Sequence, residues 1–94
     1  MFILSANGAS LVDTTGLDIR AINQQVQMED GSIQVQTIGF EIIGFGFGYS
    51  VSLGQYPMEQ QARDIFNDML ANIKQNKEFY DVREHEKKFV ERWK

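Results

Sequence analysis

GFEIIGFGFGYSVSLG, the stretch from Gly39 to Gly54, decides the fold. Its middle part alternates without a break between large apolar residues and small ones. The large residues are Phe45, Phe47, Tyr49, Val51 and Leu53, and only glycine and serine stand at positions 44, 46, 48, 50 and 52. Because successive side chains of a β-strand point to opposite faces, this pattern predicts one long central strand with an aromatic face and an almost bare face. We expect Phe45, Phe47 and Tyr49 to be core residues beneath a helix.

Short strands with tight turns are predicted before this stretch. Phe2-Ile3-Leu4 and Ser10-Leu11-Val12 flank Asn7-Gly8, a dipeptide typical of hairpin turns. From Leu17 the apolar residues change parity, which indicates a bulge near Ala21–Asn23. Glu29-Asp30-Gly31 is the clearest turn, and alternation resumes after it. The pattern predicts an antiparallel meander of four or five strands over about residues 2–54.

The period becomes helical after Pro57. An apolar stripe recurs at three- and four-residue spacing and predicts a helix over about residues 57–75. Its members are Met58, Ala62, Ile65, Phe66, Met69, Leu70 and Ile73. A short C-terminal helix follows an extended stretch at 79–82. The predicted fold class is therefore α+β, with one domain over residues 1–82 and a charged amphipathic extension over 83–94. A mixed barrel capped by a helix, or one long bent helix after Pro57, is the alternative.

Composition excludes several classes of function. The 94 residues carry a net charge of −4 and no cysteine, so neither a disulfide framework nor a zinc–cysteine site is possible. Residues 1–76 hold three basic and eight acidic side chains, which opposes general phosphate binding. The opening MFILSANGAS lacks a basic n-region, and residues 39–54 are too short and polar to span a bilayer. We expect a cytoplasmic protein with no membrane partner.

No catalytic constellation is visible. His85 is the single histidine and lies among charged residues, so we expect it on the surface without the orienting partner that a general base needs. Neighbouring Glu84 and Glu86 do not face one another on a helix, which opposes a metal site. We therefore expect no enzyme activity, no catalytic residues, no metal and no cofactor.

Single-stranded nucleic-acid binding is the alternative function. Ile43–Ser50 is similar in pattern to the aromatic octamer of the RNA-recognition motif, in which rings on an open sheet face stack on bases. Here Ile43 replaces the basic residue and Ser50 the last aromatic one. Since the surrounding domain is acidic, we do not expect nucleic acid as the partner.

Two features favour binding to a protein. The bare strand face at Gly44, Gly46 and Gly48 has room for a second copy of the sheet. Glycine destabilises the middle of a strand, so its presence there favours a close approach of another backbone. Phe89 and Trp93 belong to an amphipathic terminal segment of a kind that docks in a partner's groove. These five residues are the candidate partner-binding site. A solvated glycine face, and a terminal segment that folds back on its own domain, remain open alternatives.

The chain also resembles a group of small uncharacterised proteins from Gram-positive bacteria and their phages or mobile elements. The resemblance lies in Phe2–Ser5 with Asn7-Gly8, in Leu53–Tyr56 leading into the helix, and in Phe79-Tyr80. The Gly-Phe-Gly-Phe-Gly run and the charged end at 83–94 depart from the pattern. The resemblance implies a short sheet followed by a helix, and it implies no activity. The function that we expect is non-enzymatic homo-oligomerisation or protein-partner binding.

Overall fold

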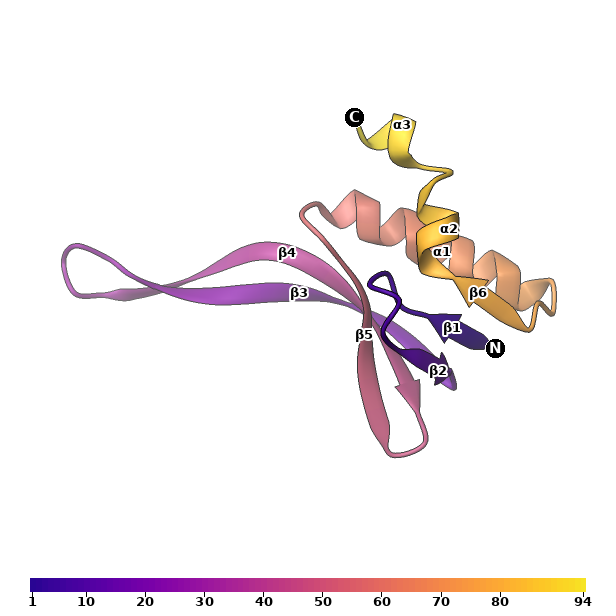
Figure 1. The fold of residues 1–94 in the computed structure, drawn as a ribbon. Coiled ribbons are helices and arrows are strands. Elements are labelled where there is room, and N and C mark those ends of the chain that lie inside the picture. The colour runs from indigo at the N-terminus through magenta and orange to yellow at the C-terminus, as the bar shows by residue number, and fades with distance from the viewer.

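The computed structural model describes residues 1–94 as an α+β fold of two small sheets around a helix (Figure 1). One sheet contains β1 (Phe2–Leu4), β2 (Leu11–Asp13) and β6 (Phe79–Asp81). The other contains β3 (Gly16–Gln27), β4 (Ile33–Gly46) and β5 (Tyr49–Tyr56) as an antiparallel meander. The helices are α1 (Glu59–Lys74), α2 (Val82–Glu86) and α3 (Val90–Trp93). The predicted fold class is confirmed.

The single long strand predicted over Gly39–Gly54 is wrong, because the chain reverses at Phe47-Gly48. Gly46 pairs with Tyr49, and Gly48 adopts a φ of 76°, a value that favours glycine. Gly46 and Gly48 are therefore as compatible with a hairpin turn as with a strand. The alternation of large and small residues continues across the turn and hides it.

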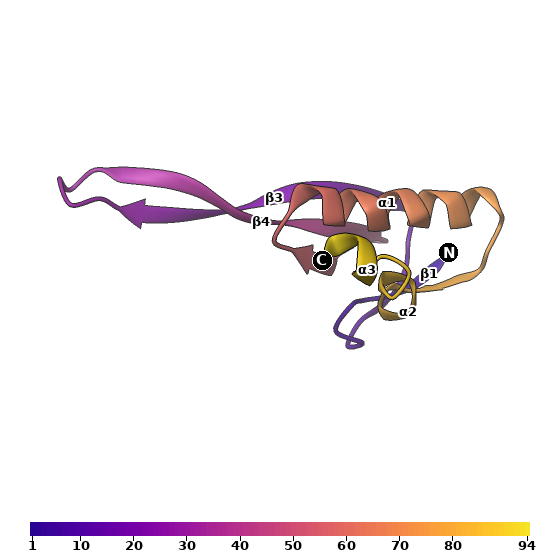
Figure 2. The same cartoon turned by 90° about the horizontal axis from the view of Figure 1, so that it is seen from above.

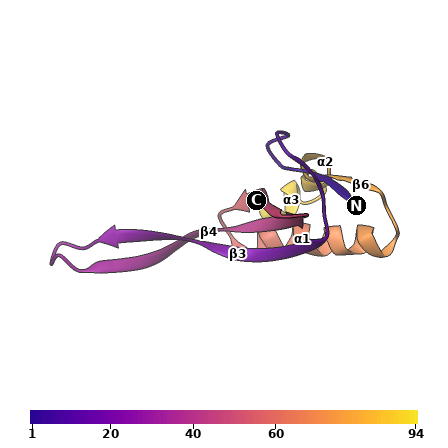
Figure 3. The same cartoon turned by 90° about the horizontal axis from the view of Figure 1, so that it is seen from below.

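The strands β3 and β4 continue beyond the rest of the molecule as a two-stranded hairpin. The pairing of β4 with β5 starts at Phe40, so the residues before Phe40 have β3 as their only strand partner. We call residues 22–38 the arm; Figures 1, 2 and 3 all show it projecting from the body. It gives the molecule principal extents of 53 × 36 × 22 Å and a radius of gyration of 15.2 Å, where a compact chain of this length has about 12 Å.

A bulge lies at the base of the arm, level with the change in parity of β3. Ile22 pairs with Gly39 and Asn23 with Thr37, so the extra residue is Ile38 on β4 and not one of Ala21–Asn23 as predicted. The turn predicted at Glu29-Asp30-Gly31 closes the far end, where Gly31 has a φ of 87°. The turn is therefore confirmed, whereas the bulge lies at the predicted level but on the opposite strand.

The small sheet joins the two ends of the chain. β1 and β2 form the predicted antiparallel hairpin, and β6 pairs with the other edge of β1 in parallel, with Phe79 beside Phe2. Ile3, Val12 and Tyr80 face inward and are fully buried. Because neighbouring side chains alternate, Phe2 and Phe79 lie on the outer face, where each is about half exposed.

Helix α1 lies against both sheets and completes the core. Its buried residues Ala62, Ile65 and Met69 belong to one apolar cluster with Ile42 and Leu53. The helix ends in a Schellman motif: Asn76 N–H donates to the Ile73 carbonyl and Lys77 N–H to the Asn72 carbonyl. Asn76 itself has a φ of 58°. The predicted stripe is thus confirmed in its middle, whereas Met58, Leu70 and Ile73 at its ends are exposed.

Candidate functional site

The arm presents both of its faces to solvent. Every residue from Gln27 to Ile38 is exposed. Gln25 pairs with Val35 and Gln27 with Ile33, so these four side chains share one face. Val35 is 64% and Ile33 65% exposed, although both are aliphatic. The arm therefore carries apolar surface that its own chain leaves uncovered.

The edges of the arm also lack the usual protection against pairing. No charged residue and no proline lies between Arg20 and Glu29 on β3, or between Asp30 and Glu41 on β4. Natural edge strands commonly carry lysine, proline or inward charges that block the approach of another strand. An isolated two-stranded hairpin is also marginally stable in water. The arm is therefore suited to strand addition, in which main-chain groups of another strand complete its hydrogen bonds.

The sequence predicts both arm strands and the turn between them, but no motif in it marks them as a binding site. The available signal was length without charge: AINQQVQ before the turn and IQVQTIGF after it. Both runs are longer than a typical strand. The rest of the chain contains too few strand residues to pair with their whole length.

The space beside two of the predicted partner-binding glycines is filled by side chains of the same chain. A Cβ atom placed on Gly44 would lie 2.8 Å from Leu53 Cδ1, and one on Gly46 would lie 2.6 Å from the ring of Tyr49. Leu53 and Tyr49 thus cover the two bare positions. Gly48 lies in the turn with open space around it. These glycines serve close side-chain packing and a tight turn.

The prediction that Phe45, Phe47 and Tyr49 are core residues is wrong for Phe47 and Tyr49. Phe47 lies at the tip of the β4–β5 turn and is 87% exposed, and Tyr49 is also exposed. Phe45 is half-buried, with the Arg20 guanidinium 5.4 Å from its ring centroid. Phe45 pairs with Ser50 while Gly46 pairs with Tyr49, so Phe45 and Tyr49 lie on opposite faces. The three rings do not form one platform.

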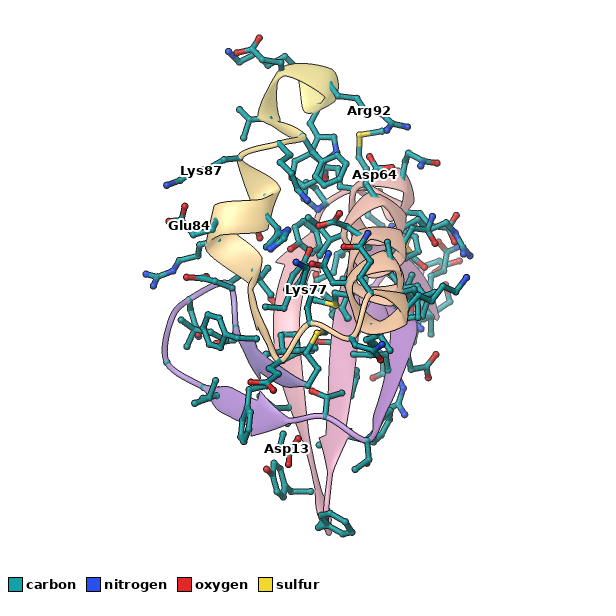
Figure 4. The ribbon with its side chains drawn as sticks, turned by 90° about the vertical axis from the view of Figure 1, so that its right-hand side faces the viewer. Asp13, Asp64, Lys77, Glu84, Lys87 and Arg92 are labelled. Carbon is teal, nitrogen blue, oxygen red and sulfur yellow. The ribbon has the colours of Figure 1, made fainter.

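Phe89 and Trp93 lie together against their own domain. Their rings stack with centroids 5.8 Å apart, and Trp93 also meets Tyr56 edge-on at 5.7 Å. Both side chains are half-buried and border the core cluster. Figures 1 and 4 show α3 and the β4–β5 turn at opposite ends of the body. The structure therefore does not bring these aromatics together with the glycines.

Two carboxylates of α1 hold the C-terminal segment, residues 82–94. Asp64 accepts hydrogen bonds from Trp93 Nε1 and Gln60 Nε2, both at 2.9 Å, and Arg92 lies 3.5 Å away. Figure 4 shows Asp64 and Arg92 near each other, while Glu84 and Lys87 point outward from α2. Burial acts to raise the pKa of Asp64, but these hydrogen bonds and the charge of Arg92 lower it below the usual range.

Asp68 has three donors from the chain that follows. Tyr80 Oη and Lys88 Nζ donate at 2.8 and 2.7 Å, and His85 Nδ1 lies 2.8 Å from the same oxygen. Burial acts to raise the pKa of Asp68, yet the bonds from Lys88, Tyr80 and His85 lower it. Burial together with the hydrogen bond to Asp68 raises the pKa of Tyr80.

The expectation that His85 lacks a partner is wrong. His85 lies against Asp68, and its ring stacks on Tyr80 with centroids 3.9 Å apart. The Asp68 carboxylate accepts from donors on β6 and the C-terminal segment, so the group holds these elements against α1. No signal in the sequence joins His85 to a residue on α1, because the contact depends on how the segment folds back.

The structure contains no group of three or more His, Asp or Glu side chains placed to hold a metal ion. None of its helices combines the length and the apolar character that crossing a membrane requires. Comparison of this chain with protein-family models, with curated proteins and with solved structures finds no match. Function is therefore inferred from the surface of the molecule itself, and above all from the arm.

Proposed function

We propose that this protein acts without catalysis, by binding protein through the arm, and that its partner is another copy of the same chain. The observation that carries the proposal is the pair of long, uncharged strands with exposed aliphatic residues Ile33 and Val35. Such a hairpin gains most from a neighbour that pairs with its edge and covers its apolar face. The family resemblance and a phage or mobile-element origin stay predictions.

The arm replaces the glycines and the C-terminal aromatics as the proposed surface. Leu53 and Tyr49 fill the space beside Gly44 and Gly46, and Phe89 and Trp93 are partly buried against the chain's own core. Ile33, Val35 and Ile38 of the arm are each more than half exposed. The choice between these surfaces is open to direct experiment.

Light scattering tests the proposal on the full chain, whose monomer mass is 10.8 kDa. A shortened variant replaces residues 23–38 by Asn-Gly, so that Ile22 and Gly39, which pair in the native register, flank a two-residue hairpin loop. We expect an oligomer for the full chain and a folded monomer for the shortened one. A full chain that is monomeric at high concentration contradicts self-association.

A pair of point variants tests which surface is used. Gln24→Lys with Val26→Lys keeps the length of the arm and puts charges on its β3 edge, as protected edge strands have, so we expect dissociation. The matched control is Leu11→Lys on β2, whose side chain is 57% exposed and lies on the body. An oligomer that survives the arm variant but dissociates with Leu11→Lys places the interface on the small sheet and contradicts the proposal.

Single-stranded nucleic-acid binding is the second candidate, because Phe47 exposes its ring to solvent. The net charge of −4 and the opposite facing of Phe45 and Tyr49 oppose it. Titration of a fluorescent single-stranded oligonucleotide with the protein at low salt tests it, and Phe47→Ala is the matched variant.

A further inference from the structure

We propose that β3 pairs antiparallel with β3 of a second copy about a two-fold axis at Gln24. The six strands would then form one continuous sheet in the order β5-β4-β3 followed by the partner's β3-β4-β5. This inference rests on the proposed self-association and adds the strand, the register and the symmetry.

β3 is the free edge best suited to pairing. It runs for 12 residues without a bulge of its own, and no hydrogen bond from another element reaches its outer edge along the arm. The other candidates are obstructed or shorter. Ala6 N–H donates to the Leu53 carbonyl at the edge of β5, and the extra residue Ile38 limits the free regular edge of β4 to residues 33–37. A bulge disrupts regular pairing, so β3 is the longest straight edge.

Residues 22–26 of β3 are chemically palindromic about Gln24. In a symmetric antiparallel pair both copies show the same face, so the axis passes through one residue that meets its own copy. Residues at equal distances on either side of that residue then face each other across the axis. With the axis at Gln24, Ile22 meets Val26 and Asn23 meets Gln25, which gives aliphatic and amide pairs.

Neighbouring registers match less well. An axis at Asn23 sets Ile22 against Gln24 and Arg20 against Val26, whereas an axis at Gln25 sets Val26 against Gln24. Both separate Ile22 from Val26, although the axis at Gln25 sets Ile22 against the apolar Met28.

The stretch that would pair is free of charge. No charged residue lies between Ala21 and Gln27, so no like charges face each other along the paired edge. Beyond this stretch, Arg20 is ion-paired with Asp18 of its own strand at 3.2 Å and would lie near Glu29 of the other copy, while Asp18 would lie level with Asp30. The charges outside the uncharged run therefore do not select the register.

A single introduced cysteine tests the register, since the chain has none of its own. Gln24→Cys would meet its copy with Cα atoms about 4.5–5.5 Å apart, within the range of a disulfide. Gln36→Cys is the matched control, because Gln36 is equally exposed and lies directly beside Gln24 on β4. Two Gln36 positions would be three strand spacings apart, about 14 Å, too far for a disulfide.

The readout is the fraction of disulfide-linked dimer under mild oxidation, together with the light-scattering mass of each reduced variant. We expect nearly complete linkage of Gln24→Cys and only background linkage of Gln36→Cys, at least tenfold less. Equal linkage of both, or linkage of neither in a protein that is still oligomeric, overturns the register but leaves assembly through the arm standing. A monomer in every variant and in the parent chain overturns both proposals.

Discussion

Phe47 shows at the scale of one residue how position decides the role of an aromatic ring. The ring lies at the tip of a turn and is 87% exposed, so its removal leaves no cavity. We expect Phe47→Ala to change the free energy of unfolding by less than about 0.5 kcal/mol, as is usual for surface sites. Urea denaturation followed by circular dichroism measures it.

Leu53 is the matched control, because it belongs to the same hairpin but is fully buried. Leu53→Ala would leave a cavity beneath α1 and should cost about 2–5 kcal/mol. A loss of that size for Phe47→Ala instead would show that the ring is buried in solution, by a partner or by a different turn.

The turn at Phe47-Gly48 also marks a limit of prediction from single residues. Gly44 needs to be glycine because of Leu53, and Gly48 because of its φ of 76°. The same residue type meets a packing need at one position and a backbone need at the other. The alternation pattern alone does not distinguish a glycine required for packing from one required for a turn. It therefore predicts one long strand where the chain forms a hairpin.

At the scale of elements, the C-terminal segment should depend on pH through Asp64 and Asp68. Both carboxyl groups have a folded-state pKa lowered below the ordinary value of about 3.9. Their contribution to stability is therefore fully present above that ordinary pKa and is lost as the pH falls through the lowered folded values. We expect the urea midpoint of the parent chain to drop between pH 6 and pH 3.

The variant Asp68→Asn should be less stable at pH 6 and should lose less between pH 6 and pH 3. Trp93, the single tryptophan, reports on the segment directly through its fluorescence. Glu29→Gln is the control, since Glu29 is an exposed carboxylate in the turn of the arm. It should show the same drop as the parent chain, and an equal drop in Asp68→Asn would remove Asp68 from the explanation.

The elements that could be predicted are those with local signals. The α1 stripe, the β1–β2 hairpin and the turn at Glu29-Asp30-Gly31 all follow from residues close in sequence. The parallel pairing of β6 with β1 and the contact of His85 with Asp68 join distant residues. Such contacts are set by the packing of the whole chain, and no periodicity records them. The arm combines both cases. Its strands are predictable from local alternation, but the absence of other elements packed against them is not.

At the scale of the whole molecule, the arm should be the least stable part of a dilute monomer. Its main-chain hydrogen bonds are exposed and its side chains bury little surface, the conditions for frequent local opening. We expect the amides of residues 23–37 to exchange rapidly at low protein concentration and to become protected as concentration rises. Hydrogen exchange followed by mass spectrometry measures this.

The amides of Val51–Leu53 in β5 provide the internal control, because they lie in the same sheet but within the body. Their exchange should not depend on protein concentration. Arm amides that are already protected in a sample of monomeric mass would show that the hairpin is stable without a partner, and would remove the main argument for assembly.

The pairing of Phe2 with Phe79 sets an order of events during translation. Tyr80 and Val82 complete the core around Ile3 and Val12, so the body stays open until this late part of the chain has emerged from the ribosome. The strands of the arm emerge much earlier, and their hairpin requires only local contacts. Neighbouring ribosomes on one message would thus hold exposed arm strands close together while their bodies are still open. On the proposed pairing, nascent chains from the same message would meet before they can diffuse apart.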